Sequence, residues 1–370
     1  MRLLWKAKTL ILFFHSTENA LSPMPLSLAP IALPLSLQYL SSDAGPQLAA
    51  LGTVRLGGTT QQAGALHIAT PVLGKAADAL ELWHTDQPVR TGTQGLLHYA
   101  MTDEVLFGAV CISDTDSDVG QYAGGGYDPL CPSLLQKVSE QAYMAVFNAL
   151  ESLGYPYLLR VWNYFSAINA ETWGMERYLQ FNIGRQDAFR KMARPFLVNA
   201  PAACALGTHG GGLNVYFLAA KVPPLALENP RQVSAYFYPD QYGPRTPSFS
   251  RAALATLSGQ RWLFISGTAS IVGHQTLHVG DVRAQTEETL RNITVLLAQA
   301  NGAAKYQGWT LASLQYKVYV RHTSDFVAVR AVLDAQLPPA AVRVYVQADV
   351  CRNDLLMEIE ATGCLPVSNA

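Results

Sequence analysis

Two glutamates near the end of the chain have the spacing of side chains that share one face of a β-strand. Residues 343–350 and 355–361 alternate apolar and polar side chains, a pattern that predicts two strands of a closing hairpin. Glu358 and Glu360 then lie about 7 Å apart on one surface, together with Arg343. The preceding strand is expected to add three polar side chains to it: Lys317, Tyr319 and Arg321.

This surface has two interpretations. Acidic and basic side chains on neighbouring strands commonly form ion pairs on a solvated sheet face. The same residues could instead form a cleft in which one carboxyl acts as a general acid among arginines. Periodicity alone favours the solvated face, so the choice stays open at this level.

Two further arginines are candidates for binding an anionic ligand. Arg245 stands in YGPRTPSFSRA, a proline-containing turn among hydroxyl residues, and Arg160 stands in the aromatic strand LLRVWNYF. A guanidinium group binds a carboxylate through two parallel hydrogen bonds. A structural turn and a structural ion pair are the corresponding alternatives.

Motifs for several other chemistries are incomplete. The segment THGGG at 208–212 is typical of an esterase oxyanion loop, but no G-x-S-x-G nucleophile elbow accompanies it. His274 and His278 are four residues apart in a glycine-containing loop, which is a weak metal signal. The five cysteines form no CxxC pair, and no phosphate-binding or dinucleotide-binding glycine motif is present. We therefore expect neither a metal nor an organic cofactor.

Composition limits the remaining classes. The chain has 370 residues, of which 49% are hydrophobic and 14% charged, with 26 basic and 27 acidic side chains. This balance argues against a disordered chain, a coiled coil and a general nucleic-acid binder. No apolar stretch has the length of about 18 residues that a membrane helix needs. We expect a cytoplasmic protein with a small-molecule substrate, no nucleic-acid or membrane partner, and a monomeric or small homo-oligomeric state.

The elements repeat in two halves. Helices are predicted over 132–153, 176–192, 282–300 and 324–336, with Asp281 as an N-cap, and strands alternate with them. We expect residues 1–30 to be a disordered N-terminal extension with Met24 as a plausible start, followed by domains over 31–222 and 223–370 that meet in the proline-rich stretch 223–247. This order predicts an α/β (α+β) fold in which each half is a mixed β-sheet with helices packed on one face.

The C-terminal half resembles the RidA-like superfamily. The segments LFISGTASIVG, HVGDVRAQTEETLRNI, KVYVR and LLMEIEA follow its order. An additional N-terminal half containing RVWNYFSAIN and NVYFLAA, with YGPRTPSFSRA before SGTAS, is similar to the chorismatases. The resemblance covers most of the chain after about residue 30. It implies two RidA-like, chorismate-mutase-like halves and an enzyme that cleaves the enolpyruvyl ether of chorismate.

The resemblance also implies roles for individual residues. Protonation of the vinyl carbon needs a carboxylic acid with a raised pKa, and Glu358 of the EIEA motif matches that acid, with Glu360 in support. Arg343 is assigned to one substrate carboxylate. The remaining binding residues are assigned with less specificity: Arg245 and Arg160 for the other carboxylate, and Tyr216 and Tyr242 for the ring hydroxyl or the pocket wall.

Two small residues bear on the product. Cys351 and Gly267 match positions of the branch of the family that forms hydroxybenzoate, with Cys351 expected to handle a proton. This favours pyruvate and 3-hydroxybenzoate, with 4-hydroxybenzoate left open as a second product. The alternatives are a hydrolytic chorismatase that releases a dihydroxycyclohexadiene carboxylate and a RidA-like imine or enamine hydrolase. A lone cysteine is more often a small core residue.

Overall fold

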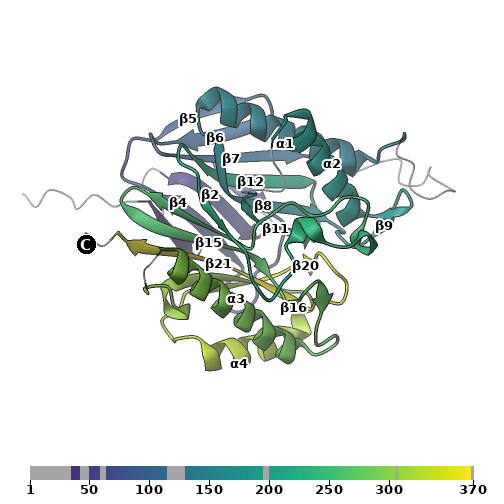
Figure 1. The fold of residues 1–370 in the computed structure, drawn as a ribbon, viewed down its shortest axis with the longest axis vertical. Helices are drawn as coiled ribbons and strands as arrows, with labels where there is room; N and C mark the ends of the chain where they lie inside the picture. The colour runs from purple at the N-terminus through teal and green to yellow at the C-terminus, as the bar shows by residue number, and fades with distance from the viewer. Residues whose placement is uncertain are drawn as a thin grey trace, which may run out of the picture. The chain divides into compact units, whose positions relative to one another are not determined.

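The computed structural model describes residues 35–41, 50–58, 64–114, 130–194, 200–304 and 307–367 (Figure 1). The predicted extension over 1–30 lies outside these ranges. Within them, none of the helices combines the length and the apolar composition that crossing a bilayer requires.

A seven-stranded mixed sheet forms the N-terminal half. Its strand order is β20-β11-β8-β12-β7-β6-β5. The strands are β5 (Arg90–Gln94), β6 (Leu97–Met101), β7 (Val105–Ile112), β8 (Tyr157–Ser166), β11 (Ala202–Thr208), β12 (Leu213–Ala220) and β20 (Asp349–Val350). Helices α1 (Leu134–Leu153) and α2 (Arg177–Lys191) pack on one face and bury a core with it. The hydroxyl of Ser133 caps α1 by accepting from the Gln136 N–H.

A six-stranded sheet forms the C-terminal half. Its order is β13-β14-β15-β21-β18-β19. The strands are β13 (Leu225–Leu227), β14 (Ala252–Leu257), β15 (Gln260–Thr268), β18 (Leu314–Val320), β19 (Arg343–Gln347) and β21 (Met357–Pro366). Helices α3 (Val282–Ala304) and α4 (Phe326–Gln336) cover its outer face. Asp281 caps α3 as predicted, since its carboxylate accepts from the Ala284 N–H at 3.0 Å.

A third sheet lies between these two layers and was not predicted. Its order is β1-β4-β2-β3, with β1 (Ser36–Leu40), β2 (Ala50–Gly57), β3 (Leu66–Ile68) and β4 (Asp78–His84). The inner faces of the three sheets share one core, in which Trp83 packs against Trp162 and Trp262. Figure 1 shows α1 and α2 on one side of the sheets and α3 and α4 on the other. The α/β class with helices on one face of each mixed sheet is confirmed.

The two large sheets have the same topology. In each, a helix connects two parallel neighbours, α2 between β8 and β11 and α4 between β18 and β19. In each, the following strand of the same sheet pairs antiparallel with the first strand of that parallel pair, β12 with β8 and β21 with β18. The sequence rhythm therefore reflects a real structural repeat.

Small elements complete the chain between the sheets. They are the two-stranded ribbons β9 (Glu171–Thr172) with β10 (Met175–Glu176) and β16 (Ile271–Val272) with β17 (Gln275–Thr276), and the single turns of 3-10 helix η1 (Ala235–Phe237), η2 (Asp240–Tyr242), η3 (Leu311–Ser313) and η4 (Thr323–Asp325). The proline-rich stretch over 223–247, predicted as the connection between the halves, contains β13, η1 and η2.

The predicted closing hairpin is wrong. β18 lies between β19 and β21, so residues 343–347 pair in parallel with β18 instead of with the last strand. Asp349 and Val350 leave this sheet and pair with β11 of the other half. Alternation along a strand fixes which side chains share a face but not which strand is its neighbour.

Candidate active site

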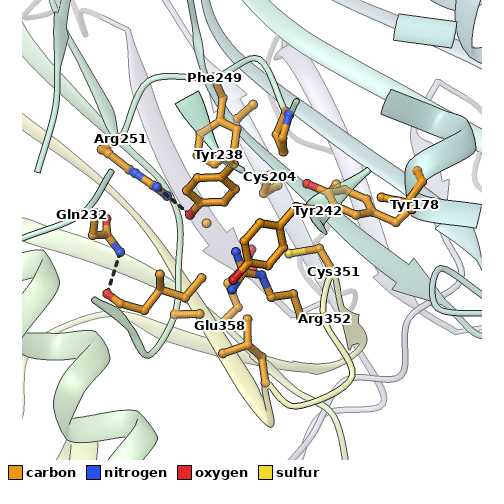
Figure 2. Close-up of a pocket in the computed structure, with 18 of the residues that line it drawn as sticks. Tyr178, Cys204, Gln232, Tyr238, Tyr242, Phe249, Arg251, Cys351, Arg352 and Glu358 are labelled. Carbon is orange, nitrogen blue, oxygen red and sulfur yellow. Dashed lines mark hydrogen bonds between the residues drawn. The ribbon is translucent and has the colours of Figure 1, made fainter. Parts of the chain in front are cut away.

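A cavity of about 140 Å³ lies where the two large sheets meet. β11 forms one wall, β15 and β21 form the other, and the loop that contains η1 and η2 closes the mouth with Tyr238 and Tyr242 (Figure 2). Both halves therefore contribute side chains. The interpretation as a solvated sheet face is wrong, because this surface is enclosed between sheets.

Glu358 is the carboxyl group of the cavity whose pKa is most strongly displaced. It is 4% exposed, on the inner face of β21, and lines the cavity. Its pKa is raised to about 8: burial and then the neighbouring Glu360 carboxylate raise it, while Arg160 and Arg251 act in the opposite direction. Glu358 is thus protonated at neutral pH, as a general acid requires.

Gly267 of β15 makes room for that carboxyl group. A Cβ built at this position would collide with Oε1 of Glu358 and would lie 2.7 Å from its Cδ and 3.0 Å from Cβ of Cys204. Real Cβ atoms do not approach so closely, so any side chain here must displace the carboxyl of Glu358. The predicted small-residue position therefore has a physical reason: it sets where the acid lies.

Three arginines face the cavity without an acidic partner. Arg185, Arg251 and Arg352 line it, and no salt bridge among the described residues involves any of them. Each has a buried guanidinium nitrogen with no hydrogen-bond partner in the described residues. Uncompensated cations in a closed site are costly unless an anion binds there.

Hydrogen bonds to neighbouring groups orient these arginines. Arg251 donates to the Val233 carbonyl and to the Tyr238 hydroxyl, both at 2.8 Å. Arg352 donates to the His274 carbonyl at 2.8 Å and lies 4.2 Å over the ring of Tyr242. The aromatic mouth of the cavity thus holds two of the cations by stacking and hydrogen bonding.

Arg321 fixes the loop that contains Cys351 and Arg352. It donates to the carbonyls of Val350, Arg352 and Leu355 at 2.8–2.9 Å and to the Asp349 carboxylate at 2.8 Å. Arg321 therefore acts on the shape of the loop and is not on the cavity wall.

Cys351 lines the cavity in the same loop as Arg352. Burial raises the pKa of its thiol to about 12, with a further contribution from Glu358. The group is therefore a neutral thiol at rest, which can donate a proton or a hydrogen bond but is not a resting base or nucleophile.

A buried polar network lies behind the cavity. Glu360 accepts from Arg160 at 2.6 Å and from Trp162 and Lys317 at 2.8 Å. Lys317 also pairs with Glu81 at 2.5 Å. The predicted shared face of Lys317 and Tyr319 with the two glutamates is confirmed, because these residues pair directly across β18 and β21.

Four of the predicted binding residues lie elsewhere. Arg343 shares its face with Tyr316, on the helix-covered side of the sheet, and pairs with Asp334 at 2.7 Å. Arg160 is committed to Glu360. The hydroxyl of Tyr216 donates to Glu81 at 3.2 Å within the inter-sheet core, and Arg245 is half-buried outside the cavity wall. Arg343 was assigned through the family resemblance, and the hairpin that would have placed it beside Glu358 does not form.

The other predicted residues come together. Glu358, Cys351, Gly267 and Tyr242 all line the cavity. The two histidines have separate partners: His274 Nδ1 lies 3.1 Å from the Tyr242 hydroxyl, and His278 lies 3.9 Å from Glu288.

None of the three arginines that line the cavity is among the residues predicted from the sequence. Arg251 is the penultimate residue of the YGPRTPSFSRA segment that also contains Arg245, and Arg352 follows Cys351 directly. The signal that was available is proximity along the chain to residues already selected. Arg185 is on α2 and carries no such signal.

Comparisons with known proteins agree with this architecture. Residues 81–219 match the family model "Chorismatase FkbO/Hyg5-like, N-terminal", and residues 246–364 match "Endoribonuclease L-PSP". The chain is 37% identical over 288 residues to a chorismatase of Streptomyces rapamycinicus and 38% identical over 291 residues to a 3-hydroxybenzoate synthase of Streptomyces hygroscopicus, with 76% of this chain and 80% of each relative covered.

A solved structure is similar over nearly the whole chain. A crystal structure of a chorismatase superposes with a TM-score of 0.77 at 32% identity and covers 90% of this chain and 99% of its own. With both halves matched by these relatives and a protonated glutamate set among unpaired arginines, the chain belongs to the chorismatase family.

Proposed function

We propose that this protein cleaves the enolpyruvyl ether of chorismate and releases pyruvate and 3-hydroxybenzoate, with Glu358 as the general acid. The observation that carries the proposal is a neutral carboxylic acid in a cavity that also holds three arginines with no salt-bridge partner among the residues that the structure describes. Chorismate is a dianion whose vinyl ether is cleaved by protonation at carbon, so its charge and its reactivity match both features.

The first step uses the proton of Glu358. Its transfer to the vinyl methylene carbon gives an oxocarbenium-like centre, after which the bond between the ring carbon and the ether oxygen breaks and pyruvate leaves with that oxygen. Arg251 and Arg352 hold the two carboxylates and so keep the methylene against the acid. The aromatic side chains at the mouth exclude water, which strengthens these charge interactions.

The second step decides the product. Chorismate has the same atoms as pyruvate plus a hydroxybenzoate, so that outcome needs no net water, whereas a dihydroxycyclohexadiene acid requires one water. As the ring hydroxyl migrates to the carbon that carried the ether oxygen, that carbon loses its hydrogen as a proton and the ring becomes aromatic. We propose that the Cys351 thiol takes up this proton and passes its own to the Glu358 carboxylate, which restores the acid. Its protonated resting state and its position in the cavity support this role.

Incubation with chorismate tests the activity. We expect wild-type protein to release pyruvate with a stoichiometric hydroxybenzoate, and Glu358→Gln to lose about 10²- to 10⁴-fold in rate, the usual contribution of a general acid. Circular dichroism of the variant checks that the fold is intact. Persistence of chorismate with the wild type, or turnover retained in the variant, contradicts the proposal.

The product role of Cys351 needs its own variant. Cys351→Ala should keep pyruvate release while it shifts the aromatic product, resolved by chromatography, toward the dihydroxycyclohexadiene acid or toward 4-hydroxybenzoate. An unchanged product distribution excludes the thiol from the second step.

A further inference from the structure

Two buried carboxyl groups lie side by side on β21. Glu358 and Glu360 are each 4% exposed and project from the same face, opposite Tyr319 and Lys317 of β18. Two such groups in a low-dielectric site are costly to ionise together, so their surroundings decide which one keeps a proton.

The hydrogen bonds of this pair are strongly asymmetric. Glu360 accepts from two cationic groups and an indole: Arg160 at 2.6 Å, Lys317 at 2.8 Å and Trp162 at 2.8 Å. All three are donors that favour the ionised form. Glu358 instead faces the cavity. The geometry therefore directs the negative charge of the pair to Glu360.

The carboxylate of Glu81 also stabilises this arrangement. Lys317 is fully buried and also binds Glu81, which in turn accepts from the Trp83 indole at 2.8 Å. The four charges alternate in sign from Glu81 through Lys317 and Glu360 to Arg160. Each ion in the row is compensated by its neighbour, which is what allows a fixed negative charge to persist behind the cavity.

We propose that Glu360 is a positioning residue for Glu358: its carboxylate, fixed by Arg160, Lys317 and Trp162, keeps the single proton of the pair on the acid that faces substrate. The inference rests on the proposed function and extends it from the acid to the network behind it. Glu360 is not among the residues that line the cavity. It acts only through the charge that it presents to Glu358.

The pKa values of the two groups agree with this division. The pKa of Glu360 is lowered to about 2 despite its burial, because Lys317 and Arg160 stabilise its charge, while that of Glu358 is raised to about 8. Other titratable or charged groups also act on the pair. Around Glu358 they are Arg251, Cys204 and Cys351, and around Glu360 they are Tyr39, Tyr164, Tyr216, Tyr319 and Cys204.

The pH dependence of chorismate cleavage tests the proposal. Wild-type kcat/KM should fall as pH rises through about 8. Glu360→Gln should move this limb at least one pH unit toward acid, so that activity is about tenfold lower at high pH and recovers at low pH. Arg160→Met should move the limb toward alkaline pH, because Arg160 favours the ionised form of Glu358. A structural role for the network would lower activity at all pH values and leave the limb in place.

A second measurement does not depend on turnover. Carboxyl-carbon NMR of protein labelled in glutamate, assigned with Glu358→Gln, follows the titration of Glu358 directly. In Glu360→Gln we expect the pKa of Glu358 measured by NMR to move toward acid by the same amount as the kinetic limb. The inference can therefore be judged even if wild-type protein leaves chorismate intact. Glu288→Gln is the matched control, since Glu288 is also buried and paired with two arginines, Arg231 and Arg291, and it is not on the cavity wall. In the Glu288→Gln variant, Glu358 should titrate at the same pH as in wild-type protein.

Two results overturn the inference. One is a Glu358 titration that is unchanged in a folded Glu360→Gln variant. The other is an equal shift in the Glu288→Gln control. If Glu360→Gln does not fold, the double variant Arg160→Met/Glu360→Gln, which removes both members of the ion pair, is compared with Arg160→Met. An acid shift of the Glu358 titration between the two supports the inference, and equal titrations contradict it.

Discussion

The two halves share one strand order but differ in the side chains on the inner face of their third strand. In the N-terminal half, β12 presents Tyr216 and Leu218 opposite Trp162 and Arg160 of β8. In the C-terminal half, β21 presents Glu358 and Glu360 at the matching places, opposite Tyr319 and Lys317. The same topology thus carries aromatic and apolar side chains in one sheet and two acids in the other.

The consequence is a site that neither half could form alone. Arg160 faces Leu218 in its own sheet and finds its acidic partner, Glu360, across the interface. The acid comes from β21, and the opposite wall, with Cys204, comes from β11. A repeated fold can therefore specialise by the residue types on one strand, because the pairing that positions them is unchanged.

Among the substitutions that compare the two halves, we expect the largest effect on activity at Gly267. Gly267→Ala places a Cβ where the carboxyl of Glu358 lies, so the acid must shift. A misplacement of about 1 Å can cost about 10²-fold in rate, and we expect a fall of that order in kcat for pyruvate release. Steady-state kinetics with chorismate measures it.

Gly108→Ala in the N-terminal half is the control for that variant. A Cβ there meets the ring of Phe217 in the core beneath α1 and lies away from the cavity. It should lower the melting temperature and leave kcat close to wild type. Equal losses of kcat in both variants would show that the effect of Gly267→Ala is general damage.

A smaller effect should separate the two C-terminal arginines. Arg352→Met removes a cavity cation with no acidic partner, and we expect KM for chorismate to rise about 10- to 100-fold, the loss of one charge-assisted hydrogen bond. Arg343→Met removes a cation on the opposite face and should change KM less than about twofold. Similar KM values for the two variants would disprove the assignment of the cavity arginine.

The raised pKa of Glu358 on β21 should also make the stability of the protein depend on pH. Because the pKa of Glu358 is raised from 4.5 to about 8 on folding, the folded state binds a proton that the unfolded state has lost between these values, so stability falls as pH rises through this window. Glu358→Gln removes the dependence. Its melting temperature relative to wild type should therefore increase between pH 4.5 and 8, as calorimetry can show; a constant difference would contradict the raised pKa.

The smallest effects concern the helix caps, which the two halves share. Ser133→Ala at α1 and Asp281→Ala at α3 each remove a side-chain acceptor for an N-terminal N–H group. Each should cost about 1 kcal/mol in denaturant unfolding without a change in KM. A much larger loss for one cap would mean that the halves differ in more than their inner faces.

Sequence alone determined the local elements and the side chains that share a strand face. The helices, the Asp281 cap and the common face of Glu358, Glu360 and Lys317 follow from short-range periodicity and backbone chemistry. The choice of Glu358 as the acid came from family resemblance, and its burial in the cavity supports that choice.

Only the tertiary structure decided which strands are adjacent and which side chains meet in the cavity. It placed β18 between β19 and β21, which moved Arg343 to the helix-covered face, and it brought Arg251, Arg352 and Arg185 to the cavity from three separate segments. Strand order and contacts between sheets join residues far apart in the chain, and no local pattern encodes them. Burial, which raises the pKa of Glu358, arises from the same long-range packing.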